Sequence, residues 1–122
     1  MSILHVRVGG STEESLEQLV GVLDAAIKGA PVTPYFGVGF RTMAHFGEVF
    51  TPRRVELIET LKTHGAQSIY ALAKRLERNY SNVHTDVGKL LELGIARKDE
   101  SGKVFVPWDE IDVQWPLQRL AA

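Results

Sequence analysis

Four polar residues between positions 81 and 89 have side chains suited to recognition through hydrogen bonds and charge. They are Ser81, Asn82, Thr85 and Lys89. In a helix that turns by about 100° per residue, this spacing places them on one side. They supply hydrogen-bond donors and acceptors, but no nucleophile stands beside a base at a familiar catalytic spacing. We therefore expect binding at this position, and we expect the protein not to be an enzyme.

The same segment has an apolar side that would hold these polar residues outward. Val83, Val87 and Leu90 recur at helical intervals, and Gly94 follows as a natural left-handed helix cap. The pattern predicts an amphipathic helix over residues 80–93. His84 falls on the border between the two sides.

Two further helices are predicted upstream. Thr51 can cap a helix whose first position is Pro52, and Gly65 ends it. The predicted buried stripe of this helix is Val55, Ile58 and Leu61. A second helix of about two turns is predicted from Ser68, with these apolar residues facing inward: Ile69, Leu72, Ala73 and Leu76.

A β-hairpin is predicted directly after the third helix. Two short strands, Ile95–Lys98 and Lys103–Val106, flank the polar turn Asp99–Gly102. Pro107 closes the hairpin. A further alternating run from Ile111 to Trp115 predicts one more strand, which Pro116 ends.

The N-terminal part is predicted to form a strand, a helix and a second strand. Residues Ile3–Val8 alternate with a period near two, which favours a strand. Ser11 and Glu14 have capping-box spacing before an amphipathic helix that ends at Gly29. The segment Tyr35–Arg41 is the second predicted strand, although Gly37 and Gly39 weaken it.

These elements predict an α+β fold in three segments. Residues 51–107 would form a winged helix-turn-helix domain, because three short helices followed by a hairpin is the order of that fold. Residues 1–50 would be a strand-helix-strand extension, and residues 108–122 a C-terminal strand and tail. We expect the extension to pack with the strand at Ile111–Trp115 and to support a homodimer, because helix-turn-helix proteins commonly match palindromic sites.

A helix with an apolar back and short polar residues in front fits the major groove of double-stranded DNA. Asn pairs with adenine, Ser and Thr bond to either kind of base edge, and Lys reaches guanine or phosphate. Ser81, Asn82, Thr85 and Lys89 are therefore the candidate base-reading residues. Candidate contacts to the DNA backbone come from the other helices, the turn, the helix border and the hairpin: Arg53, Arg54, Lys74, Arg78, His84, Arg97, Lys98 and Lys103.

Composition is compatible with this interpretation without requiring it. The whole chain has a formal net charge of −1, but residues 51–105 contain ten Lys and Arg against seven Asp and Glu. The chain has no cysteine, which fits a reducing compartment, and the N-terminus has only a short apolar run. We therefore expect a cytoplasmic protein without membrane association. The four histidines are dispersed, so neither a metal site nor another cofactor is expected.

Residues 51–117 resemble a family of prokaryotic DNA-binding proteins of the winged helix-turn-helix superfamily. The resemblance is carried by TPRRVELIETL, SIYALAKRL, NYSNVHTDVGKLLELGI and PWDEIDVQWPL. It implies transcriptional regulation, most simply repression. Two residues depart from the pattern: Glu77 stands where many such proteins have a turn glycine, and Gly88 lies inside the third helix.

Two alternatives stand beside this interpretation. Some members of the resembled family look like antitoxins, so the aromatic N-terminal half or the PWDEIDVQWPL tail could bind a toxin protein while the chain regulates its own operon. Lys and Arg on amphipathic helices are also often merely solvated, and Ser or Asn at a helix start is often only a cap.

Overall fold

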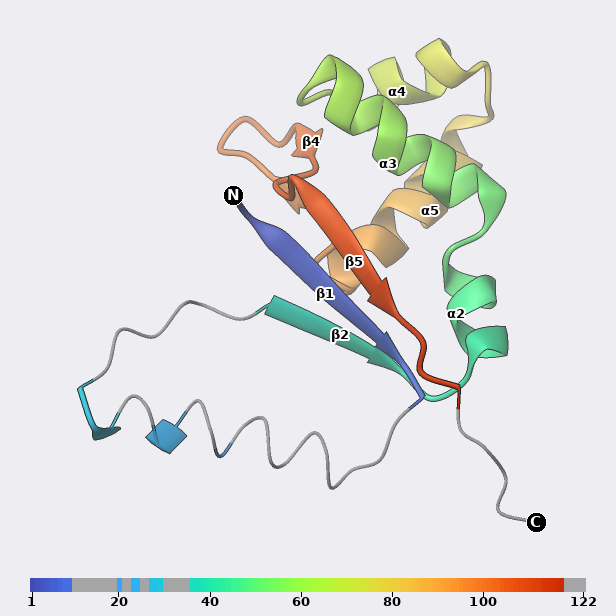
Figure 1. Cartoon of the computed structure of the whole chain (residues 1–122). Coiled ribbons are helices and arrows are strands. Elements are labelled where there is room, and N and C mark those ends of the chain that lie inside the picture. Colours follow the sequence, from blue (N-terminus) through green and yellow to red (C-terminus); the bar gives the residue numbers. More distant parts are fainter. Residues whose placement is uncertain (10–19, 21–22, 25–26, 30–35, 118–122) are drawn as a thin grey trace. The chain divides into compact units, whose positions relative to one another are not determined.

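The computed structural model describes residues 1–9, 20, 23–24, 27–29 and 36–117. It contains helices and short strands in an α+β arrangement (Figure 1). Most of the helix predicted from Ser11 to Gly29 lies outside the described residues, as do residues 118–122.

The chain divides into two compact units. The helical unit comprises Met1–Ser2 and Gly47–Glu110, and the sheet unit comprises Ile3–Phe46 and Ile111–Ala122.

Helix α3 (Pro52–His64) forms where the sequence predicts it. The Thr51 hydroxyl accepts a hydrogen bond from the Arg54 amide at 3.3 Å, which satisfies one of the orphan N–H groups of the first turn. Pro52 stands in that turn, where a missing N–H costs nothing. At the other end Gly65 has a φ of 82° and donates its amide to the Leu61 carbonyl.

Helices α4 (Ile69–Leu76) and α5 (Tyr80–Glu92) also match the prediction and are joined by a short turn. Ser68 caps α4 by accepting a hydrogen bond from the Ala71 amide at 3.1 Å. Glu77 ends α4 with a φ of 54°, and it is the one non-glycine residue with positive φ in the described part of the chain. The departure noted in the sequence therefore lies at the position where a glycine would be unstrained.

The core of the helical unit lies between α3, α4 and α5. Its fully buried side chains include Leu57, Leu61 and Leu72, each of which contributes about 1.5–3 kcal/mol by leaving water. The predicted stripe of α3 is only partly correct: Leu61 is buried, but Val55 is 38% exposed and Leu57 takes the inward position. The buried residues Leu57 and Leu61 are four positions apart, on the helix that contacts α5 and β4. The predicted stripe instead had a spacing of three residues.

The predicted hairpin is present but its strands are shorter. Strand β3 (Arg97–Lys98) pairs antiparallel with β4 (Val104–Phe105), with Arg97 opposite Phe105 and Lys98 opposite Val104. Gln67, between α3 and α4, extends this pairing: its amide donates to the Val104 carbonyl at 3.0 Å and its carbonyl accepts from the Val104 amide at 2.7 Å. This bridge ties the base of the hairpin to the helices.

The sheet unit contains a sheet in the order β2-β1-β5. The strands are β1 (Ile3–Val8), β2 (Phe36–Phe40) and β5 (Glu110–Gln114). Strands β1 and β2 are parallel, with Val6 opposite Val38 and Val8 opposite Phe40. Burial alternates along β1, as predicted, because Leu4, Val6 and Val8 point to the same apolar face. All three predicted strands of this unit are therefore confirmed.

Helix α2 (Met43–Val49) was not predicted. It has seven residues and contains Gly47, so it has neither the length nor the apolar repeat that indicates a helix in the sequence. Its start is capped locally, because the Thr42 hydroxyl accepts a hydrogen bond from the His45 amide at 3.1 Å. Phe40 packs edge-on against Phe46 and His45 beside it.

Candidate nucleic-acid interface

The inward side of α5 fixes the orientation of the whole helix. Val83, Val87 and Leu90 each have 0% exposure, so no other rotation of α5 would bury the same surface. The apolar back predicted from the sequence is thus confirmed. The polar residues predicted to lie opposite it must then face outward.

The outward side of α5 is polar and exposed near its N-terminus. Ser81, Asn82 and Thr85 are exposed, and the Lys89 side chain is 35% exposed and 3.7 Å from the Glu92 carboxylate. The Thr85 hydroxyl donates to the Ser81 carbonyl at 3.0 Å, which leaves its methyl group and a lone pair for other contacts. All four predicted base-reading residues are therefore accessible.

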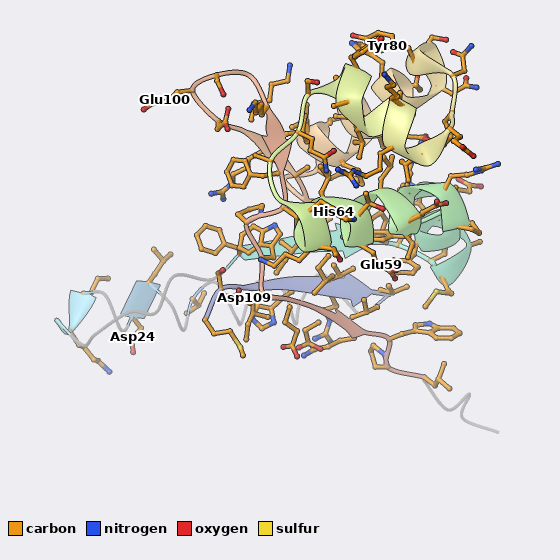
Figure 2. All side chains as sticks on the ribbon, turned by 90° about the horizontal axis from the view of Figure 1, so that it is seen from above. Asp24, Glu59, His64, Tyr80, Glu100 and Asp109 are labelled. Atoms are coloured by element: carbon orange, nitrogen blue, oxygen red, sulfur yellow. The ribbon has the colours of Figure 1, made fainter. Side chains whose placement is uncertain are left out.

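Ser81 also takes part in the cap of α5. The Asn79 side-chain oxygen accepts from the Ser81 amide at 2.9 Å and from the Ser81 hydroxyl at 2.8 Å. The start of α5 is consequently held by a side chain rather than left open. Tyr80 follows the cap, is 50% exposed, and stacks loosely on the exposed His84 with 6.0 Å between ring centroids. Figure 2 shows Tyr80 at the outer edge of the helical unit.

Arg54 and Arg78, predicted to contact the DNA backbone, lie in a different setting. The Arg54 Nε donates to Asp86 Oδ1 at 3.0 Å, and the Arg78 Nη2 donates to Asp86 Oδ2 at 2.7 Å. The three side chains are only 12–16% exposed. Arg54 also donates through Nη1 to the Val49 carbonyl at 3.1 Å. Both guanidinium groups are thus engaged inside the fold, where they hold α5 against α3 and the turn.

Asp86 is a site residue that sequence reasoning missed. It lies on α5 one turn after Val83, beside the apolar back rather than on the outward side. A carboxylate at that border needs a charged partner, because an unpaired charge is costly to remove from water. Its partners lie 32 and 8 positions away in the sequence, so no local pattern indicates the pairing.

The hairpin turn is held by one carboxylate. Asp99 Oδ1 accepts hydrogen bonds from the Ser101 amide at 3.0 Å, the Ser101 hydroxyl at 2.8 Å and the Lys103 amide at 2.9 Å. These bonds favour the ionised form, so the pKa of Asp99 is lowered, chiefly by the Ser101 hydroxyl. Figure 2 shows Glu100 at the outer bend of this turn. Lys98 and Lys103, on either side of the turn, are exposed.

Trp108 connects the hairpin to the end of α5. Its indole N–H donates to the Gly94 carbonyl at 3.0 Å, and the side chain is almost fully buried. The Arg97 guanidinium lies 5.3 Å from the centre of the indole ring, within cation–π range. The predicted C-terminal segment therefore begins with a residue that belongs to the helical unit and orders its hairpin.

The other predicted backbone contacts are exposed. Arg53 lies in the first turn of α3 and Lys74 in the last turn of α4. Arg54 and Arg78 are thus largely buried, whereas the other six members of that set remain at the surface of the helical unit. These six are Arg53, Lys74, His84, Arg97, Lys98 and Lys103.

Among the described residues, no group of three or more His, Cys, Asp or Glu side chains could hold a metal ion. No helix formed by these residues has the length and apolar character needed to cross a membrane.

Comparison with known proteins places the chain in one family. No curated protein matches the chain. No solved structure matches it either. A family model named HVO_A0114 matches residues 49–113, which include α3, α4, α5 and the hairpin and make up more than half of the 122 residues. The chain belongs to the HVO_A0114 family.

Proposed function

We propose that this protein is a winged helix-turn-helix regulator that binds double-stranded DNA in a sequence-specific manner. Helix α5 would enter the major groove, and the β3–β4 hairpin would serve as the wing on the adjacent backbone. Repression is its simplest regulatory action, because a protein bound at a promoter blocks transcription by occupying it.

The proposal depends most on the outward side of α5. Its back is fully buried, and Ser81, Asn82 and Thr85 are presented on the other side by a capped helix start. Short hydrogen-bonding side chains allow a helix to approach base edges closely, and Asn is the residue suited to a bidentate contact with adenine.

The hairpin supplies the second support. Lys98 and Lys103 are exposed on a turn that Asp99 holds in one shape, and Trp108 and the Gln67 bridge fix its base. A preordered loop with two cations loses little conformational entropy when it contacts phosphate. Arg53 and Lys74 are the further candidate phosphate contacts, whereas Arg54 and Arg78 are assigned to positioning α5.

The experiment selects bound fragments from genomic DNA and then measures affinity for the selected duplex over a range of salt concentrations. Asn82→Ala should weaken binding to that duplex by about 1–3 kcal/mol and relax its sequence preference. Lys98→Ala should weaken all duplexes alike and reduce the slope of log affinity against log salt by about 0.9.

Lys62→Ala is the matched control for Lys98→Ala. Lys62 is also a surface lysine of the helical unit, but its ammonium group lies 3.6 Å from Asp109, and Figure 2 places Asp109 far from Tyr80 at the start of α5. We expect its affinity and salt slope to equal those of the wild type. Equal affinity and slope in the wild type, Asn82→Ala and Lys98→Ala would refute the proposed interface.

A further inference from the structure

Strand β5 lies at one edge of the sheet within the described part of the chain. The strand order is β2-β1-β5, so β5 has β1 on one side only (Figure 1). Edge strands expose backbone amides and carbonyls that can pair with another strand, and natural proteins usually protect such edges with charges or proline. In β5 the charges, Glu110 and Asp112, lie on one face only, and the other face has Ile111 and Val113.

The backbone of β5 presents alternate residues to that edge. The Glu110 amide points toward β1, since it lies 3.4 Å from the Ser2 carbonyl just before β1 begins. Successive residues of a strand direct their amides to opposite sides, so Asp112 and Gln114 also direct theirs toward β1. The backbone amides that point to the outer edge are then those of Ile111, Val113 and Trp115, the last of which lies beyond the strand end.

The side chains of the same residues form an apolar row. Val113 is 42% exposed and Trp115 is 51% exposed, while Asp112 and Gln114 occupy the opposite face. On that opposite face Asp112 is paired with His5 of β1 at 3.5 Å. One face of the edge strand is therefore polar and internally paired, and the other is apolar, with Ile111 half-buried and Val113 and Trp115 exposed.

We propose that β5 pairs antiparallel with β5 of a second copy of this chain, around a two-fold axis at Val113. In this register Val113 lies opposite its own copy and Ile111 lies opposite Trp115, so the apolar side chains of the two copies contact one another across the pair. On the other face Asp112 lies opposite Gln114, where a carboxylate accepts from an amide. Pro116 is compatible with this pairing. The backbone groups at its position point toward β1, so its missing N–H is not needed at the outer edge.

Charge excludes two neighbouring registers in which matching faces stay together, and strand length disfavours a third. An axis at Asp112 would place two aspartates directly opposite each other, and an axis at Ile111 would place Glu110 opposite Asp112. Like charges directly opposite in a sheet are destabilising. The axis at Val113 extends the pairing one residue past the end of β5, to Trp115, whereas an axis at Gln114 would extend it further, to Pro116 and Leu117.

The proposed interface is independent of DNA binding and adds to the proposed function. Pairing of two short strands buries less area than a standard protein interface, so we expect a weak dimer with a dissociation constant of about 1–100 µM. Two-fold pairing would also join two helical units in one molecule, as binding to two half-sites of a palindrome requires.

Complementary charges at the axis test the proposal without DNA. Sedimentation of the full chain at about 5–500 µM, chosen to span this affinity, should show a monomer–dimer equilibrium for the wild type. Val113→Glu and Val113→Lys, each alone, should weaken self-association at least tenfold, because each puts like charges opposite each other. Their equimolar mixture should restore the dimer, which also demonstrates that both variants fold.

Three outcomes would overturn this assignment: a monomeric wild type, undiminished dimerisation of either single variant, or a mixture that fails to recover. A monomeric wild type that still binds duplex DNA with the expected salt slope would remove the dimer and leave the proposed function intact. Dimerisation without any DNA binding would remove the proposed function and leave the dimer intact.

A single cysteine tests the register. The chain contains no cysteine, so Val113→Cys introduces one thiol per chain. Residues directly opposite each other in an antiparallel pair are close enough for a disulfide. Mild oxidation should therefore link Val113→Cys into a dimer. Ile111→Cys is the matched control, because its two copies would lie about 13 Å apart in this register. Equal linkage of the two variants would contradict an axis at Val113.

Discussion

The two sides of α5 place their polar side chains in different surroundings. On the inner border Asp86 binds the guanidinium groups of Arg54 and Arg78, and all three side chains are at most 16% exposed. On the outward side Ser81, Asn82 and Thr85 are exposed, and on the neighbouring hairpin Lys98 and Lys103 are exposed as well. Arg54 and Arg78 therefore have a structural role because the largely buried Asp86 binds them, whereas Lys98 and Lys103 remain accessible.

The difference shows why the number of cations in a segment is a poor guide to a binding surface. Residues 51–105 contain ten Lys and Arg, but two of them are committed to one internal carboxylate. Buried ion pairs gain little net stability when formed, yet removing one partner is costly because the other stays desolvated.

Asp86→Ala should have the largest effect, on stability. It leaves two nearly buried guanidinium groups without their carboxylate, and Arg78 Nη1 is already buried without a hydrogen-bond partner among the described residues. We expect a loss of about 3–5 kcal/mol in the free energy of unfolding. Urea denaturation followed by far-UV circular dichroism measures it.

Glu92→Ala is the control for Asp86→Ala. It removes a carboxylate from the same helix, but one whose side chain is 68% exposed and 3.7 Å from Lys89. Its unfolding free energy should change by less than about 1 kcal/mol. A similar small change for Asp86→Ala would show that the inner network is not structural.

Adjacent arginines in α3 provide a second, smaller contrast. Arg54→Ala should lower stability by about 1–3 kcal/mol, because it removes bonds to Asp86 and to the Val49 carbonyl. Arg53→Ala should leave stability unchanged and reduce the salt slope of duplex binding by about 0.9. Thermal unfolding and fluorescence anisotropy on the same two preparations measure both quantities. The assignment of Arg54 to structure and of Arg53 to DNA contact fails if Arg54→Ala changes only the salt slope, or if Arg53→Ala changes only stability.

The smallest expected effect is the pH dependence of the hairpin turn. The pKa of Asp99 is lowered in the folded protein, so its contribution is present above the pKa of an unfolded aspartate, about 3.9, and is lost as pH falls through the lower folded value. Amide hydrogen exchange at Ser101 and Lys103, corrected for intrinsic rates, should therefore show constant protection from pH 7 to about pH 5 and reduced protection below about pH 4. In Asp99→Ala protection should be low throughout. Protection that is equal in both proteins would show that Asp99 does not hold the turn.

Local sequence patterns predicted the helical unit well. Thr51, Ser68 and Gly65 act through neighbours within a few residues, so their caps are visible in the sequence and are confirmed in the structure. The buried line Val83, Val87 and Leu90 was equally clear, because helical periodicity is a local property. The alternation of Ile3–Val8 likewise predicted β1.

Contacts between distant residues could not be predicted in this way. Arg54 and Asp86 are 32 positions apart, and their pairing depends on how α3 packs against α5. The same packing turned Leu57 inward in place of Val55. The roles of Trp108 and Gln67 depend on which backbone groups the fold brings beside them, Gly94 in one case and Val104 in the other. Short α2 had no periodic pattern to detect.

The most direct test of the account maps the amides that respond to DNA. A labelled sample of the whole chain is titrated with its selected duplex, and backbone amide shifts are followed by NMR spectroscopy. We expect the largest changes at five residues: Ser81, Asn82, Thr85, Lys98 and Lys103. The largest changes along the outer edge of β5 instead, or no saturable change at any residue of α5, would contradict it.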